Sequence, residues 1–294
     1  MMASPELSCI ADIQRIVTRP GCEARYSSVD LGWTSACAFI QRENPFQASV
    51  HPAPHHLLVF HLGAGAHVKA RADDTHVRRS VPAGSIYVWP ADQAFNISLE
   101  SWVETMHLYL HRDLFGSETE LKPELCVRDT LLLELGTELA RLMKSRVGAM
   151  DLYVDSLAVA MAERLVSRCV DGRVASRRRG RPGLSPVKLR RVVEYIDSNL
   201  QEPIRLSQLC EIANMSPAHF VRQFKATLGQ PAHQFVLNRR IELARKLLSH
   251  SDQPLVEVAL HCGFTHQEHL TNVFRRLVGI APGAYRRSAN SPGW

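Results

Sequence analysis

The last hundred or so residues contain an internal repeat, and this repeat constrains the fold more than any other feature of the chain. One copy reads LSQLCEIANMSPAHFVRQFKATLG and begins at Leu206, and the other reads LVEVALHCGFTHQEHLTNVFRRLVG and begins at Leu255. Matching positions are 49 residues apart at first and 50 residues apart after one inserted residue, so that Phe224 corresponds to Phe274. A repeat of this length predicts that one supersecondary unit occurs twice.

Each copy has the composition of a helix-turn-helix unit. A small residue in the first helix, Cys210 or Ala259, allows the second helix to cross it closely. Four residues later stands a residue that tolerates a positive φ, Asn214 or Gly263, as the sharp end of a helix requires. We therefore predict two helix-turn-helix units in tandem.

The second helix of each unit is predicted to have one apolar and one polar face, with Ser216 and Thr265 as N-caps. The residues expected to face the core are Phe220, Phe224, Leu228, Leu270, Val273, Phe274 and Leu277. The residues that we assign to DNA binding are Ser216, Ala218, His219, Arg222, Lys225, Gln267, Glu268, His269, Asn272, Arg275 and Arg276. Arginine pairs bidentately with guanine and asparagine with adenine, while Lys225 and Arg275 suit phosphates.

Charge is divided unevenly along the chain. Residues 177–294 hold 18 Lys and Arg against 8 Asp and Glu, whereas residues 1–176 hold 17 against 21. A basic half points to a polyanionic partner, and two helix-turn-helix units favour DNA over a generally basic surface or an ordinary helical bundle. The helix predicted over 233–249 would be a rigid spacer, and a separation of roughly 34 Å would place both second helices in successive major grooves.

The N-terminal half is predicted to be rich in short strands separated by turn residues, which is typical of a β-barrel or sandwich. The expected strands are His56–Leu62, His67–Ala72, His76–Val81, Ser85–Trp89, Phe95–Leu99 and Val103–Leu110. Residues 1–50 have no clear pattern. In the last run, Met106 and Leu108 alternate with His107 and Tyr109, so the two pairs should face opposite sides.

Two amphipathic helices, Asp129–Arg146 and Asp151–Val170, are predicted to form a helical hairpin. Its apolar faces need a partner, either the β domain or a second subunit. The segment Asp171–Gly183 has the composition of a linker, and its RRRGRP run is either a solvated tether or an arm that contacts the minor groove. Ser185 and Pro186 then predict the start of another helix.

The region Leu184–Arg287 closely resembles a known family. The resemblance depends on RRIELARKLL, on the pair Gly263-Phe264 and on the run VALHCGFTHQEHLTNVFRRLVGIAPGAYRR. These residues match the C-terminal signature of the AraC/XylS family of transcription regulators. Two positions depart from the family pattern: Leu270 stands where an aromatic residue is usual, and Asn272 where arginine is frequent.

The resemblance implies an α+β multidomain protein with a cupin-like β-barrel and an all-α tandem helix-turn-helix domain. We place the sensor domain at 1–125, a hairpin for dimerisation at 126–172, the linker at 173–184 and the DNA-binding domain at 185–294. The run GSIYVWPADQAFN resembles the second cupin motif. Phe95 stands where a metal-binding cupin has histidine, and Asp92 where glycine is usual. We therefore expect no metal and no cofactor.

Ligand binding is expected in the interior of the β domain. The candidate effector-binding residues are His61, Trp89, Phe95, Trp102 and His107. Six histidines fall between His51 and His76, but their spacing favours surface positions over metal coordination. Seven cysteines, an odd number without a CxxC pair, argue against a disulfide framework and a cysteine-rich zinc site.

The sequence thus predicts a cytoplasmic, homodimeric transcription activator that binds promoter DNA and responds to a small molecule. No basic start precedes an apolar run, and no stretch approaches 18 apolar residues. RNA polymerase is a partner that such an activator could contact. Two alternatives remain: an enzyme, either a cupin catalyst or an alkyl-damage repair protein with this module, and an architectural DNA-binding protein without an effector.

Overall fold

The structure is a computed structural model that describes residues 21–50, 52–63, 66–72, 75–115, 121–145, 151–170 and 183–289. The chain divides into two compact units. The first, here called the β unit, contains residues up to 146 and residues 157–177. The second, here called the helical unit, contains residues 147–156 and the chain from 178 onward. The basic run at 177–181 lies outside the described residues.

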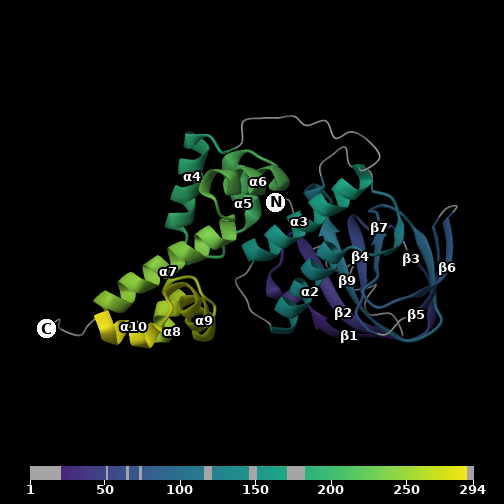
Figure 1. Cartoon of the computed structure of the whole chain (residues 1–294), viewed down its shortest axis with the longest axis horizontal. Helices are drawn as coiled ribbons and strands as arrows, with labels where there is room; N and C mark the ends of the chain where they lie inside the picture. Colours follow the sequence, from purple (N-terminus) through teal and green to yellow (C-terminus); the bar gives the residue numbers. More distant parts are fainter. Residues whose placement is uncertain are drawn as a thin grey trace, which may run out of the picture. The chain divides into compact units, whose positions relative to one another are not determined.

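The β unit contains two antiparallel sheets (Figure 1). The six-stranded sheet has the order β1-β2-β9-β4-β7-β10, and the four-stranded sheet has the order β3-β8-β5-β6. The strands are β1 (Cys22–Ser27), β2 (Ala36–Glu43), β3 (Phe46–Val50), β4 (His55–His61), β5 (Ala66–Ala72), β6 (Thr75–Val81), β7 (Ile86–Trp89), β8 (Phe95–Leu99), β9 (Val103–His111) and β10 (Glu124–Val127). The β-rich prediction is confirmed, with the described strands arranged as two sheets.

Side chains from both sheets form the core of this unit. Tyr109 and Trp89 from the six-stranded sheet pack in one cluster with Val68, Phe95 and Leu99 from the four-stranded sheet. The rings of Trp89 and Phe95 are stacked, with centroids 4.0 Å apart. Stacking of aromatic rings adds to the stabilisation from burial.

Four strands were not expected from the sequence. The edge strand β1 is mostly polar and exposed, with little contrast between its faces. The edge strand β3 does alternate, with Phe46, Ala48 and Val50 half-buried and the residues between them exposed, but it has only five residues. Strand β2 is buried on both sides, so its residues do not alternate in polarity. The two-sided burial of β9, which includes both Leu108 and Tyr109, has the same cause: the second face of the six-stranded sheet is covered as well.

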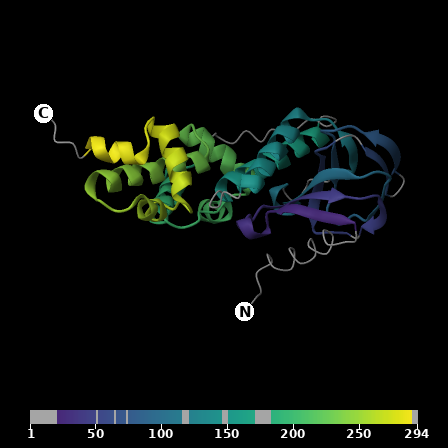
Figure 2. The same ribbon diagram turned by 90° about the horizontal axis from the view of Figure 1, so that it is seen from below.

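Helix α2 (Thr130–Ser145) covers this second face, and residues 157–170 of α3 (Asp151–Val170) belong to the same unit (Figure 2). A Cβ at Gly136 would lie 2.5 Å from the Phe60 ring, so glycine is required for the close approach of α2 to β4. The Asp129 carboxylate accepts hydrogen bonds from Arg164 at 2.8 Å and from the backbone of Leu132 at 3.1 Å. The apolar face of α2 therefore has its partner within the same chain.

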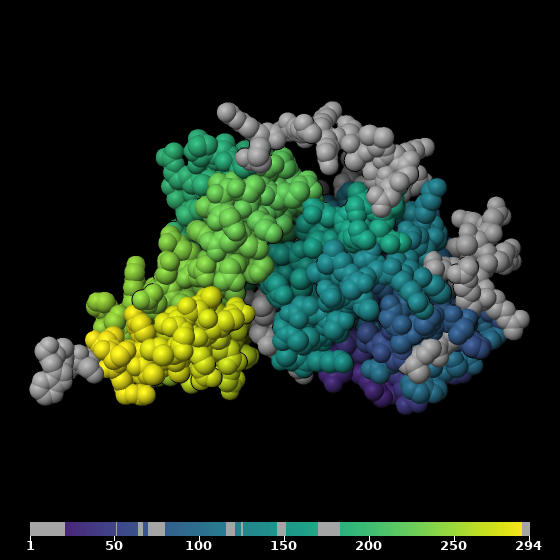
Figure 3. Space-filling view, in the orientation of Figure 1, coloured from purple at the N-terminus to yellow at the C-terminus, as the bar shows by residue number. Residues whose placement is uncertain are grey.

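Seven helices lie within 183–289. Figure 1 draws them as ribbons, and Figure 3 shows atoms of the same region in green to yellow. The helices are α4 (Pro186–Ser198), α5 (Leu206–Ala213), α6 (Pro217–Leu228), α7 (Ala232–His250), α8 (Leu255–His261), α9 (Gln267–Val278) and α10 (Pro282–Ala289). The start of α4 is as predicted, because the Ser185 hydroxyl accepts from Lys188 N at 3.4 Å. Within the described part of the chain, no helix is both long and apolar enough to cross a membrane.

Candidate nucleic-acid interface and ligand cavity

The first helix-turn-helix unit consists of α5 and α6. Helix α5 ends at Asn214, whose φ of 46° lies in the left-handed region. The backbone N–H of Met215 then donates to the Cys210 carbonyl at 3.0 Å. This six-residue bond closes the helix end in the manner of a Schellman motif.

The second unit, α8 and α9, repeats this geometry. Gly263 has a φ of 74°, and Phe264 N donates to the Ala259 carbonyl at 2.9 Å. The matching bonds confirm the structural equivalence predicted from the repeat. The predicted cap at Thr265 is wrong, because the inserted residue makes His266 the N-cap. Ser216 does occupy the N-cap position of α6, although its side chain accepts no capping hydrogen bond.

The second helices present most of the assigned residues to solvent. The exposed ones are Ser216, His219, Arg222, Lys225, Gln267, Glu268, Asn272, Arg275 and Arg276. Ala218 is half-buried. His269 is also half-buried and packs edge-on against the Phe264 ring, with centroids 5.2 Å apart, so the structure places it against the core. The expectation that Leu277 faces the core is wrong, since 39% of its surface is exposed.

A cavity lies between the two sheets of the β unit and contains about 510 Å³ of space without protein atoms, part of it open to solvent. Four of the five candidate effector-binding residues line it: His61, Trp89, Phe95 and His107. Trp102 does not. It is 53% exposed and lies under the Arg42 guanidinium, whose carbon is 4.7 Å from the ring centroid.

Glu43 and Thr105, which no sequence pattern indicated, form the polar end of the cavity with His61 and His107. The Thr105 hydroxyl donates to Glu43 Oε2 at 2.9 Å, and His107 Nε2 lies 3.4 Å from the same oxygen. Burial lowers the pKa of His61 to about 4, with a smaller lowering from nearby His107, and Glu43 opposes this shift. His61 is therefore a neutral imidazole at pH 7. In the described residues, no three His, Cys, Asp or Glu side chains are arranged to hold a metal ion.

Arg240, in the middle of α7, lies between the loop before α5 and the turn of the second helix-turn-helix unit. Its guanidinium donates from Nε to the Leu200 carbonyl at 3.0 Å and from Nη2 to the Glu202 carbonyl at 2.9 Å. Gly263 packs against the same place: a Cβ there would lie 2.1 Å from the Leu200 oxygen and 2.8 Å from Arg240 Cζ. Arg240 thus ties the loop before α5 to the spacer helix and to the turn of the second unit.

Residues 209–288 match the family model described as a helix-turn-helix domain. The C-terminal region is an AraC-type helix-turn-helix domain. Similar curated proteins include the probable transcriptional regulator LumQ of Photobacterium leiognathi, 37% identical over 92 residues, which are 31% of this chain and 37% of LumQ. The regulatory protein PocR of Salmonella typhimurium is 32% identical over 103 residues, 35% of this chain and 34% of PocR.

These matches span about a third of the length of each relative, and they concern the AraC-type domain alone. Among solved structures, the DNA-binding domain of AdpA in complex with a target DNA is 33% identical, covering 37% of this chain and all of that chain, with a TM-score of 0.35.

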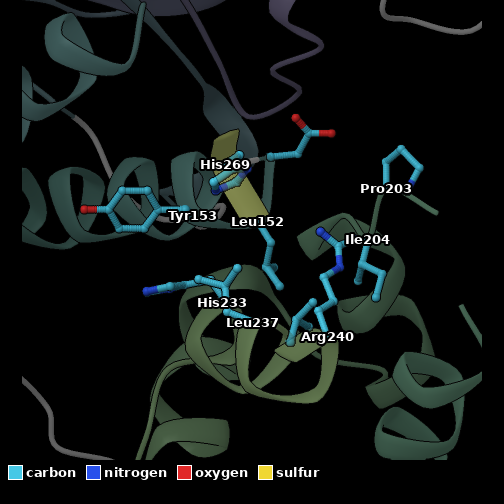
Figure 4. Close-up of a pocket in the computed structure, with 10 residues that line it drawn as sticks. Leu152, Tyr153, Pro203, Ile204, His233, Leu237, Arg240 and His269 are labelled. Atoms are coloured by element: carbon cyan, nitrogen blue, oxygen red, sulfur yellow. The ribbon is translucent and has the colours of Figure 1, made fainter. Parts of the chain in front are cut away.

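The AraC-type domain is packed against residues 151–156 at the start of α3. Figure 4 shows Leu152 and Tyr153 facing His233 and Arg240 of α7 across a small pocket. The Tyr153 and His233 rings lie 4.8 Å apart. Asp155, which is fully buried, accepts a hydrogen bond from Leu206 N at 3.1 Å and so caps the start of α5.

Asp151 gives this packing a pH dependence. Burial and the neighbouring Asp155 raise the Asp151 pKa to about 6, although Arg205 and Arg240 oppose the shift. Because the folded state then holds this proton more tightly than the unfolded state, unfolding free energy should fall as the pH rises from about 4 to about 6. We expect Asp151→Asn to raise the thermal midpoint at pH 7.5 and to lose this advantage at pH 3.5. Asp252→Asn, at an exposed loop position, is the control and should change neither; an Asp151→Asn gain that persists at pH 3.5 would contradict the shift.

Proposed function

We propose that this chain is a cytoplasmic transcription regulator that binds promoter DNA through α6 and α9, each in one of two successive major grooves. It acts as an activator under the control of a small molecule bound in the β unit. The observation that carries the proposal is the pair of helix-turn-helix turns closed by the same backbone bond, each followed by a helix with an exposed polar face. Relatives of this domain named as regulators support it.

The exposed faces have the chemistry for both kinds of DNA contact. Arg222 on α6 and Asn272 on α9 are exposed near the middle of their helices, where base edges come within reach. Lys225 and Arg275 are exposed one turn or less further along and suit the phosphate backbone. Helix α7 has 19 residues, or about 28 Å of helical rise, which is comparable to one turn of DNA.

Arg222→Ala and Lys225→Ala form a matched pair that tests this assignment. We expect Arg222→Ala to weaken binding to the operator by about 1–3 kcal/mol while binding to random DNA changes little. Lys225→Ala should weaken binding to both DNAs by similar factors and reduce the dependence on salt. The measurement is a competition titration of labelled operator with random duplex. Equal losses on both DNAs for Arg222→Ala would show that this residue contacts only phosphate.

Dimerisation through the hairpin at 126–172 is the remaining part of the proposal. Leu131 on α2 is 48% exposed and could contribute apolar surface to such a contact. Sedimentation equilibrium of the full chain should give twice the monomer mass, and Leu131→Glu should shift the equilibrium toward monomer. A monomer at every concentration tested would remove dimerisation from the proposal, while DNA binding by one chain could still be measured.

A further inference from the structure

The cavity between the sheets combines a long apolar wall with a small polar end. Eleven of its lining residues are apolar or aromatic: Phe46, Val50, Leu57, Val59, Val68, Tyr87, Trp89, Phe95, Ile97, Leu99 and Val103. The other four are Glu43, His61, Thr105 and His107. A lining that is mainly apolar, with a few polar groups at one end, is typical of a site for a small organic molecule.

The polar end is built by neighbouring strands of the six-stranded sheet. His61 on β4 is the direct cross-strand partner of Thr105 on β9, and Val59 is the partner of His107. Glu43 on β2 joins this group through the Thr105 hydroxyl. The four side chains therefore converge from three adjacent strands, and rigid strands hold them in place.

Among the described residues that line the cavity, His61 has the most unpaired hydrogen-bonding capacity. His61 is 3% exposed, yet neither Nδ1 nor Nε2 has a hydrogen-bond partner in the described part of the chain, while Trp89 and His107 each have one unpaired ring nitrogen. Leaving buried polar atoms unpaired is destabilising, because they lose the hydrogen bonds that water would supply. A bound molecule that supplies a missing hydrogen bond would remove part of this destabilisation, and the position of His61 in the cavity wall makes that possible.

The charge of the lining restricts the ligand. Among the described residues that line the cavity, Glu43 is the charged one, and none is a lysine or an arginine. A carboxylate or phosphate would lie near the Glu43 carboxylate without a cation from these residues to offset its burial, which is costly in a site of low polarity. A sugar, with many hydroxyl groups, would leave most of them against apolar walls.

The hydrogen-bonding capacity of His61 selects among the remaining classes. A neutral imidazole offers one N–H donor and one nitrogen acceptor. The two nitrogens point away from each other, so one ligand group pairs with one of them. An ammonium group only donates, so it could pair only with the nitrogen that carries no proton. A hydroxyl group both donates and accepts, so it can pair with the nitrogen that faces it in either tautomer. Glu43 is already engaged by Thr105, which leaves His61 as the main polar contact.

We propose that this cavity binds a small, uncharged and mainly apolar alcohol or phenol, whose hydroxyl group hydrogen bonds to His61. The hydrocarbon part lies between the two sheets, against the Trp89 and Phe95 rings. That this molecule is also the effector rests on the proposed function above, whereas its binding to the β unit does not.

The test uses the full chain without DNA and two series of matched probes. The first is 2-naphthol, 2-naphthoate, 2-naphthylmethylammonium and naphthalene, and the second is octan-1-ol, octanoate, octylammonium and octane. Isothermal titration and the thermal midpoint give affinity for each probe. We expect an alcohol or phenol to bind saturably and at least about tenfold more tightly than the charged and hydrocarbon members of its series. Tighter or equal binding of a carboxylate or an ammonium compound, or no saturable binding of any probe, would overturn the proposal.

Two variants locate the binding. His61→Phe removes both ring nitrogens at similar volume and should weaken the preferred alcohol or phenol about tenfold, with little change for the hydrocarbon. Trp102→Phe, outside the cavity, should leave all affinities unchanged. Unchanged affinity for the alcohol or phenol in His61→Phe would also overturn the proposal. If circular dichroism shows that His61→Phe is unfolded, the order of probe affinities for the unmodified chain decides whether the proposal holds. Operator binding is then measured with and without the preferred probe, so a failure of regulation is distinguished from a failure of ligand binding.

Discussion

Gly263→Ala is expected to destabilise the helical unit by about 2–5 kcal/mol. Two effects add at this position. The backbone has a φ of 74°, which an L side chain adopts only with strain, and the new Cβ would lie 2.1 Å from the Leu200 carbonyl oxygen. Neither the turn nor the loop that carries Leu200 can give way without loss of the Arg240 hydrogen bonds. The measurement is urea unfolding followed by circular dichroism at 222 nm.

Gly229→Ala is the matched control for this prediction. Gly229 ends α6 with a φ of 71°, almost the same as Gly263, but apart from its chain neighbours no atom of the described residues lies within 4 Å of the position that its new Cβ would occupy. This variant should cost only the strain of the left-handed backbone, about 1–2 kcal/mol. The difference between the two variants isolates the steric contact. Equal losses would mean that the close packing of the second turn contributes nothing to stability.

Arg240→Met is expected to cost about 2–4 kcal/mol and to weaken operator binding. Arg240 is 4% exposed, and its loss would leave the Leu200 and Glu202 carbonyls without their side-chain donors. Burial lowers the Arg240 pKa to about 10, so the guanidinium still carries its charge at pH 7. These bonds join the loop before α5 to α7. Their loss in Arg240→Met should therefore also make the separation between α6 and α9 less fixed.

The neighbouring residue provides the comparison. Arg239→Met removes a guanidinium that is paired with Asp197 and Glu242 on an exposed face of the same helix. Such surface pairs contribute about 1 kcal/mol or less. In urea unfolding and in operator titrations, Arg240→Met should show a clearly larger loss than Arg239→Met. If Arg239→Met lowers stability and operator binding as much as Arg240→Met does, then the positive charge on α7 is what matters, and the buried hydrogen bonds of Arg240 are not.

The helical unit could be predicted closely because its constraints are local. Positive φ at Asn214 and Gly263 requires particular residue types, and the period of the apolar residues sets each buried face. The half-buried position of His269 could not be predicted from this period. His269 lies in the first turn of α9, and its ring packs against the Phe264 ring that fills the turn. The burial of Arg240 could not be predicted for a different reason. Arginine in a helix is usually exposed, and it is the tertiary contacts of α7 that bury this one.

The β unit was predicted less completely because its pattern depends on partners distant in sequence. Strand β2 is central to the six-stranded sheet, but burial of both its faces removes the alternation that identifies a strand. Glu43 lies on that strand, so its place beside Thr105 and His107 could not be expected. Trp102 is an aromatic residue near a turn, and no sequence pattern distinguishes its exposed position from the buried one of Trp89.

The most direct test of the central proposal is fluorescence anisotropy of the full chain with duplex DNA from upstream of its own and neighbouring genes. Random duplex of the same length is measured beside it, each at two salt concentrations. The proposal predicts that one upstream segment binds more tightly than random DNA and keeps this preference at the higher salt. Binding that is equal on all duplexes and disappears at the higher salt would contradict sequence-specific recognition by α6 and α9.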